Sequence, residues 1–464
     1  MQQPTAPVQT RVRVIAGSSL LGAVVTVLGL LLMWALRVDS IWVVLFLVPI
    51  LLAATAPALA RQAARDRDRR LFQLLLLALV LKLVGSLVRY YVSFEIYGGL
   101  VDSALYHEVA AGLSEQYRSG NFDTGLTSLS GTNFVPFFTS LVYTVIGPNI
   151  FAGYLLFGWL AFWGTFYIYR AFTIAMPGGN RRSYAYLLFF LPSLLYWPSS
   201  IGKDAWMLFT LGLAAYGVAR ILTGRVLRGA VVAGTALWLA ALVRPHVAGM
   251  VGLGLAVAYM VGRTRSRAGW QAAVMKLLGL AAVIVLAALL LSQTTAFLKD
   301  SGLDPEDGVA SVLSENRERT EQGGSSFGTP RPGISPVQLP VSVVTILFRP
   351  FLFEANSIQV LITALESTVL LVLTVRRIRP IGRAVRSFRR LPYVTFVVVY
   401  GLLFIVAFSS IGNFGILARE RCQLLPFFLV LLAVPGVRGR RPSAPATTTS
   451  QPIRRADAGQ LVRA

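Results

Sequence analysis

Long apolar runs recur along almost the whole chain, and they constrain its fold more than any other feature. Each is about 20 residues long, the length that an α-helix needs to cross the hydrocarbon core of a bilayer. Hydrophobic residues make up 55% of the 464, and charged residues only 14%. A transmembrane β-barrel would show shorter segments of alternating hydrophobicity instead. The sequence therefore predicts an all-α, polytopic integral membrane protein.

From these runs we predict about twelve transmembrane helices. They are assigned to residues 14–36, 41–60, 71–93, 150–172, 183–199, 204–222, 229–243, 247–262, 272–292, 356–375, 391–410 and 422–437. The further apolar run 133–147 is left out, because one more span there would move every later arginine cluster to the other face of the membrane. We interpret Phe134 to Ile146 as an interfacial or re-entrant helix.

Clusters of arginine separate the predicted spans and set their orientation. The net charge of +23 includes groups such as Arg61 to Arg70, Arg181/Arg182 and Arg376 to Arg390. Short loops rich in Lys and Arg stay in the cytoplasm, so we predict a multi-pass protein of the cell membrane with both termini cytoplasmic. One transmembrane domain then covers 1–437, with interfacial helices in two large outer loops at 94–149 and 293–355. A disordered cytoplasmic tail follows at 438–464.

The same composition excludes several classes of function. The positive charge is not assigned to nucleic-acid binding, because the sequence has no soluble basic domain to carry it. Cys422 is the only cysteine, and His107 and His246 are the only histidines, so the sequence has neither a disulfide framework nor a zinc-binding pattern. We predict membrane lipid, but no nucleic acid, as a partner. No cofactor is assigned, and a requirement for a divalent metal stays open.

A short polar segment at the start of the first outer loop is the strongest candidate for chemistry. Ionisable groups are costly in hydrocarbon unless they are paired or reached by water. Beyond Asp102, apolar residues recur at helical spacing and predict an amphipathic surface helix over 103–117. Asp102 at its start has two interpretations, which can coexist: an N-cap that accepts backbone N–H groups, and a catalytic carboxylate.

Three neighbours of Asp102 are further candidates. His107 and Glu108 are candidates for catalysis, and Tyr106 is a candidate for substrate binding. The alternative for Tyr106 and His107 is a place at the membrane interface, which amphipathic aromatic side chains favour.

Five cations fall on the side of the membrane that the charge rule disfavours. They are Lys203, Arg244, Arg349, Arg419 and Arg421, each at the predicted outer end of a span. One such arginine alone is commonly an anchor or half of an ion pair, and Lys203 has Asp204 beside it as a possible local partner. Five on one face are instead consistent with a convergent pocket for a phosphate or pyrophosphate. His246, two residues after Arg244, is grouped with them as a substrate-binding candidate.

The order of features over residues 94–250 resembles the GT-C superfamily of membrane glycosyltransferases. The first outer loop begins with Asp102-x-x-x-Tyr106-His107, and a surface helix follows that ends near Gly120-Asn-Phe122. Next come Gly131-Thr-Asn-Phe-Val-Pro136, an apolar stretch, and Gly147-Pro-Asn149 before a new helix. The resemblance is one of order and texture rather than of a tight signature.

This resemblance implies a donor, an acceptor and roles for particular residues. Members of the superfamily use polyprenyl-phosphate sugars, and an acid of the first outer loop serves as catalytic base or metal-linked acid. Asp102 matches that acid by position, with Glu108 as the second candidate. Basic residues at later outer helix ends hold the lipid phosphate, a role open to Arg244, Arg349, Arg419 and Arg421. The acceptor would be a glycan or lipid of the cell envelope.

Other classes of function stay open beside this hypothesis. An O-antigen-type oligosaccharide polymerase would use the same lipid carriers and outer arginines but would need no catalytic acid. A transporter or flippase would place ionisable residues at mid-membrane depth, and Lys82 and Glu366 are the only deep charges in the predicted spans. A structural partner in a membrane assembly is the remaining alternative.

Overall fold

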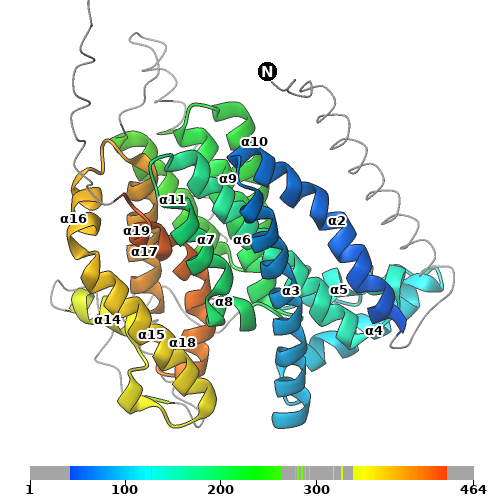
Figure 1. The fold of residues 1–464 in the computed structure, drawn as a ribbon. Helices are drawn as coiled ribbons and strands as arrows, with labels where there is room; N and C mark the ends of the chain where they lie inside the picture. The colour runs from blue at the N-terminus through cyan, green and yellow to red at the C-terminus, as the bar shows by residue number, and fades with distance from the viewer. Residues whose placement is uncertain are drawn as a thin grey trace, which may run out of the picture.

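The structure is a computed structural model that describes residues 42–262 except 127, residues 338–435, and ten single positions between 277 and 327. These residues form helices, and no β-strand occurs among them. Figure 1 shows the helices gathered into one bundle, with α4 and α5 at its side. The predicted span 14–36 and the predicted tail 438–464 lie wholly outside the described residues, and the predicted span 272–292 lies largely outside them.

Among the described helices, five are long and apolar enough to cross a membrane. They are α2 (Trp42–Asp66), α3 (Arg69–Tyr91), α6 (Ile150–Ala175), α9 (Lys203–Leu222) and α15 (Ile358–Arg376). Shorter apolar helices accompany them: α5 (Phe134–Ile146), α10 (Val226–Ala241), α11 (Pro245–Val261), α14 (Gln338–Phe348) and α17 (Pro392–Phe408). The all-helical, multi-pass prediction is therefore confirmed at this level, whereas the count of twelve spans stays a prediction.

The bounds of the long helices follow from local chemistry. Asn149 accepts a hydrogen bond from the Ala152 N–H at 2.9 Å and caps α6, and Ser357 caps α15 in the same way. Proline stands at the first turn of α11 and α17, where it has the helical φ and its missing N–H costs nothing. Each of these bounds lies within a few residues of the predicted span.

Helices α6 and α9 form the centre of the bundle, and two glycines let them touch. A Cβ atom on Gly164 would lie 2.2 Å from the Leu208 carbonyl oxygen, and one on Gly212 would lie 2.2 Å from the Gly164 carbonyl oxygen. Small residues at such a crossing bring backbones into van der Waals contact, which drives helix association where no hydrophobic effect operates.

Two predicted spans are wrong as single helices. The segment predicted at 183–199 breaks at Leu191-Pro192 into α7 (Arg181–Phe190) and α8 (Pro192–Tyr196), because proline cannot donate the hydrogen bond that would continue α7. The segment predicted at 422–437 divides into the turn Arg421–Gln423 and α19 (Leu425–Leu432). At about 1.5 Å per residue neither α8 nor α19 is long enough to cross a bilayer by itself.

The two charged residues that lie deep in predicted spans, Lys82 and Glu366, form hydrogen bonds with backbone groups of α8, next to the break at Pro192. Lys82 of α3 donates to the Leu194 carbonyl oxygen at 2.6 Å, and Glu366 of α15 accepts from the Ser193 N–H at 2.7 Å. Free carbonyl and amide groups are costly inside a membrane protein unless a partner is supplied. Lys82 and Glu366 thus have a structural role at α8.

Both predicted outer loops contain helices that pack against other helices of the protein. The helix predicted over 103–117 is confirmed as α4 (Asp102–Arg118), whereas its place on the membrane surface stays a prediction. Phe134–Ile146 forms α5, which packs against it. In the second loop, α14 (Gln338–Phe348) packs against α15 and α17 and buries Ile346, Leu347 and Phe348. The part of loop 293–355 around α14 is therefore integrated into the helix bundle.

Candidate active site

Asp102 is the first residue of α4, and its carboxylate points away from the helix backbone. Val101 occupies the N-cap position, and no side chain caps this helix. The N-cap interpretation of Asp102 is therefore wrong. One carboxylate oxygen instead accepts a hydrogen bond from Arg419 at 3.2 Å, while 62% of the side chain stays exposed. Asp102 is thus held by a cation and remains open to a ligand.

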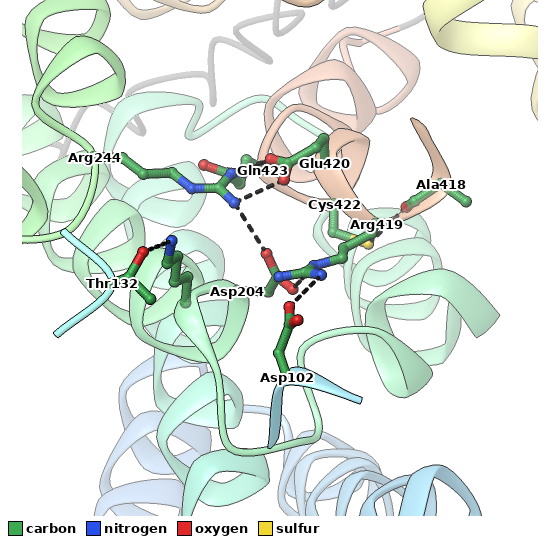
Figure 2. Close-up of polar contacts among 10 residues, drawn as sticks. Asp102, Thr132, Asp204, Arg244, Ala418, Arg419, Glu420, Cys422 and Gln423 are labelled. Carbon is green, nitrogen blue, oxygen red and sulfur yellow. Dashed lines mark hydrogen bonds and ion pairs between the residues drawn. The ribbon is translucent and has the colours of Figure 1, made fainter. Parts of the chain in front are cut away.

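Arg419 joins Asp102 to a second carboxylate. It lies at the end of α18 (Phe414–Glu420), and its Nε donates to Asp204 at 2.5 Å. Asp204 is in the first turn of α9, so the ion pairs connect three helices that are far apart in the sequence (Figure 2). The neighbouring carboxylates, Asp204 foremost, hold the pKa of Arg419 above its ordinary value, and the guanidinium stays charged.

Behind Arg419 the ionic network continues into the protein. Arg244, the N-cap residue of α11, lies 3.6 Å from Asp204 and donates two hydrogen bonds to Glu420, one of them at 2.7 Å. Gln423 donates to the same carboxylate at 2.8 Å (Figure 2). Burial, the largest single effect, would raise the pKa of Glu420, but the charge and hydrogen bonds of Arg244, together with Arg419 and Gln423, outweigh it and hold the pKa below its ordinary value. This network carries both signs of charge and is buried, so each charge depends on its partner.

Arg89 belongs to the same site as Asp102 and Arg419, and no carboxylate of the described residues pairs with it. It lies near the end of α3, and its guanidinium carbon is 4.8 Å from the ring centroids of both Tyr196 and Trp197. It also donates to the Tyr196 hydroxyl at 2.8 Å. Among the described residues no hydrogen-bond acceptor contacts its buried Nε. The two aromatic faces fix the guanidinium by cation–π contact and leave donors available for an anion.

These groups surround one pocket of about 200 Å³ at the end of the bundle. We call it the Asp102 pocket; its polar lining comprises Arg89, Asp102, Ser103, Tyr106, Ser200, Asp204 and Arg419. Tyr106 stands one helical turn after Asp102, and burial, with a smaller effect of the Asp102 charge, raises its pKa to about 12. The phenol is therefore protonated at neutral pH and can donate a hydrogen bond. The pocket combines an exposed carboxylate with two guanidinium groups.

Several predicted site residues lie outside this pocket. His107 Nδ1 lies 2.9 Å from the Tyr143 hydroxyl on α5, and burial lowers its pKa. Glu108 is exposed on α4. His246 packs on α11 with its ring 6.1 Å from that of Phe408. None of the three contributes to the lining of the Asp102 pocket.

The expected convergence of all five cations is also wrong. Arg421 is fully buried and pairs with Glu366 at 3.3 Å, so it cannot line an open cavity. Arg349 pairs with Glu354, lies over the Phe327 ring and lines a different pocket. Lys203 donates to Thr132 at 2.7 Å rather than to its neighbour Asp204. Only Arg419 reaches the Asp102 pocket, and Arg244 supports it from behind.

Three important residues were absent from the sequence-based set. Arg89 lies inside an apolar span, and Asp204 was considered only as a partner of Lys203. Glu420 stands between Arg419 and Arg421 in the sequence, and an acid flanked by two arginines at a helix end was a usable indication of an ion-pair network.

No metal-binding cluster of His, Cys, Asp and Glu side chains is found in the part of the chain that the structure describes. The acids nearest to one another here, Asp102, Asp204 and Glu420, are each held by arginine instead. Comparison of the chain with protein-family models, with curated proteins and with solved structures finds no match.

Proposed function

We propose that this protein is a membrane glycosyltransferase that moves a sugar from a polyprenyl-phosphate carrier to an envelope glycan or lipid. One observation carries the proposal: the exposed carboxylate of Asp102 shares a pocket with the guanidinium groups of Arg89 and Arg419. A carboxylate can accept the proton of an acceptor hydroxyl. Fixed cations stabilise the charge that develops on a departing phosphate.

The step balances with these groups alone. The acceptor oxygen forms a bond to the anomeric carbon of the sugar, and its proton passes to Asp102. The bond between that carbon and the phosphate oxygen breaks, and its electron pair leaves with the phosphate. Arg89, which pairs with no carboxylate in the part of the chain that the structure describes, is assigned to the phosphate; Arg419 orients Asp102 at 3.2 Å. Tyr106 donates a hydrogen bond to the sugar or the phosphate.

The size of the pocket favours transfer of a single sugar. Its volume of about 200 Å³ is below the roughly 300–1,000 Å³ typical of larger organic ligands. A polymerase that joins oligosaccharides would need more room around the bond. A polymerase could use Arg419 and Arg421 together at the outer face, but Arg421 is buried with Glu366, which counts against this alternative.

The test is the isosteric substitution Asp102→Asn in purified protein. Transfer from polyprenyl-phosphate hexoses and pentoses to membrane glycolipid is expected to fall by about 10²-fold or more, because the amide cannot take the proton. Glu108→Gln is the matched control, since Glu108 lies on the same helix, is exposed and is outside the pocket; its rate should equal the parental rate. An unchanged rate in Asp102→Asn rules out the assigned base.

Binding of unsubstituted polyprenyl phosphate tests the anion site separately from turnover. Arg89→Gln should weaken this binding by about ten- to a hundredfold, the effect of losing hydrogen bonds to a charged group. Asp102→Asn should leave it intact. If the parental protein transfers none of the sugars and Arg89→Gln binds the carrier as tightly as the parental protein, the proposed function is wrong.

We further propose that the Asp102 pocket faces outward and that both termini are cytoplasmic, because this arrangement leaves the arginine-rich helix ends inside. Ser119 and Ser183 are exposed and lie on the two sides that it distinguishes. A membrane-impermeant thiol reagent added to intact cells should label Ser119→Cys and not Ser183→Cys. Native Cys422 is buried and serves as the internal blank. Labelling of Ser183→Cys alone reverses the proposed orientation.

A further inference from the structure

A second pocket lies between the α2–α3 turn, α6 and α7, and the proposed function does not use it. Its volume is about 370 Å³. In Figure 1 the α2–α3 turn lies near the upper end of α3, and the lower end of that helix leads toward α4. We call it the Arg182 pocket and define it by Asp68, Arg70, Leu74, Arg181, Arg182 and Tyr186.

Cations exceed anions in this pocket. Arg181 pairs with Asp66 at 3.2 Å, and Arg182 donates from two nitrogens to one oxygen of Asp68. Arg70 adds a third guanidinium, is exposed, and has no side-chain partner among the described residues. Arg182 is itself 67% exposed, so its remaining donors are open to a ligand.

Two helix N-termini point into the same space. Asp68 caps α3 by accepting from the Arg70 N–H at 3.0 Å, and Asn180 caps α7 by accepting from the Ser183 N–H at 3.1 Å. The N-terminal end of a helix carries partial positive charge and attracts anions. The helix ends and the three arginines therefore favour the same sign of ligand.

The pocket also has an apolar side. The candidate membrane span that contains α3 begins at Arg69, so we place the pocket where this helix would pass from polar surroundings into hydrocarbon. Leu71 and Leu74 of α3 and Ala185 and Tyr186 of α7 line its apolar side. Tyr186 is 59% exposed, and interfacial tyrosines commonly lie at the level of lipid headgroups.

We propose that the Arg182 pocket binds the headgroup of an anionic phospholipid. The phosphate contacts Arg70 and Arg182 and the helix N-termini, and an acyl chain follows Leu74 and Tyr186 into the membrane. Basic pockets between transmembrane helices are a known way of holding such headgroups. A soluble phosphate would use the cations but would gain nothing from the apolar side.

The experiment measures lipid retention by native mass spectrometry of the purified full chain. The parental protein should retain phosphatidylglycerol in preference to phosphatidylcholine. Arg70→Gln and Arg70→Gln/Arg182→Gln should lower that retention, the double variant by about tenfold or more. Arg70→Gln breaks no ion pair, so it keeps the test meaningful even if the double variant folds poorly.

A matched control removes the same charge from other exposed arginines. Arg225 and Arg228 flank the start of α10, are exposed, and lie outside the pocket. Arg225→Gln/Arg228→Gln should retain phosphatidylglycerol like the parental protein. Equal losses in both double variants would mean a diffuse charge effect and overturn the site. Equal retention of the two lipids by the parental protein, or displacement of phosphatidylglycerol by stoichiometric inorganic phosphate, would overturn the lipid assignment.

Discussion

At the end of the bundle that holds the Asp102 pocket, most ionic side chains are buried, and Arg244 and Arg419 each contact two carboxylates. At the Arg182 pocket the pairs are single and more exposed, and cations exceed anions. The first arrangement fixes helices relative to one another and leaves one acid exposed. The second keeps positive charge available at the membrane surface. Similar residue types therefore have different roles according to their burial. Water weakens an exposed ion pair, whereas a charge buried away from water is costly without a partner.

The largest loss of stability is expected from Glu420→Gln, which removes the charge of a buried acid at the Asp102 end with little change of shape. Arg244 would keep its charge at 9% exposure and lose its main carboxylate. Breaking one side of such a pair costs about 3–5 kcal/mol. Denaturant unfolding in detergent should show this loss, together with a low yield of folded protein. A stability equal to the parental value would mean that water reaches this network.

A double-mutant cycle that removes the charges of Glu366 and Arg421 tests the same dependence of a buried charge on its partner. Glu366→Gln and Arg421→Met should each destabilise the protein, because each leaves one unpaired charge buried. The double variant removes both charges. The amide oxygen of the new Gln can still accept the hydrogen bond that Ser193 N–H donates to Glu366 in the parental protein. Its unfolding free energy should recover most of the combined loss. If the loss in the double variant equals the sum of the two single losses, Glu366 and Arg421 do not stabilise each other.

Removal of an acid at the more exposed Arg182 pocket should have only a small effect on stability. Asp68→Asn removes the Arg182 ion pair but keeps a side chain that can cap α3. Exposed ion pairs contribute roughly 0.2–1 kcal/mol to stability, so the free energy of unfolding should fall by no more than that amount. A loss as large as that of Glu420→Gln would erase the difference between the two ends.

The smallest expected effect concerns pH. Burial lowers the pKa of His107 in the folded protein, so folding favours the neutral ring. Its contribution to stability is complete above the unfolded pKa of about 6.5 and is lost as the pH falls below that value. Thermal unfolding of His107→Gln, compared with the parental protein at pH 8 and pH 5.5, should show a smaller loss at the lower pH. An identical loss would mean that other groups cause the acid sensitivity.

Much of the helix content could be predicted from the sequence. Span length and arginine clusters place α3, α6, α9, α15 and α17 within a few residues of their observed bounds, and helical spacing of apolar residues locates α4. These properties are local, since a stretch of about 20 apolar residues or an Asn before a helix acts through neighbours in the chain.

The partners of the charges could not be predicted in the same way. Arg419 meets Asp102 across 317 positions and Asp204 across 215, and nothing local distinguishes Asp204 from a partner of Lys203. Arg419 and Arg421 are separated by one residue, yet one reaches a pocket and the other is fully buried. The turn that begins at Arg421 directs these two side chains to different neighbours.

The sequence by itself determined that this chain is an all-helical membrane protein, that its positive charge lies at helix ends, and that Asp102 begins a surface helix. Only the tertiary structure decided that Lys82 and Glu366 serve the broken helix at Pro192, that Arg89 faces the Asp102 pocket, and which arginines are paired. Hydrophobicity and capping depend on the chain within a few turns. Electrostatic pairing depends on distance and burial, and these are fixed only when helices from remote parts of the chain pack together.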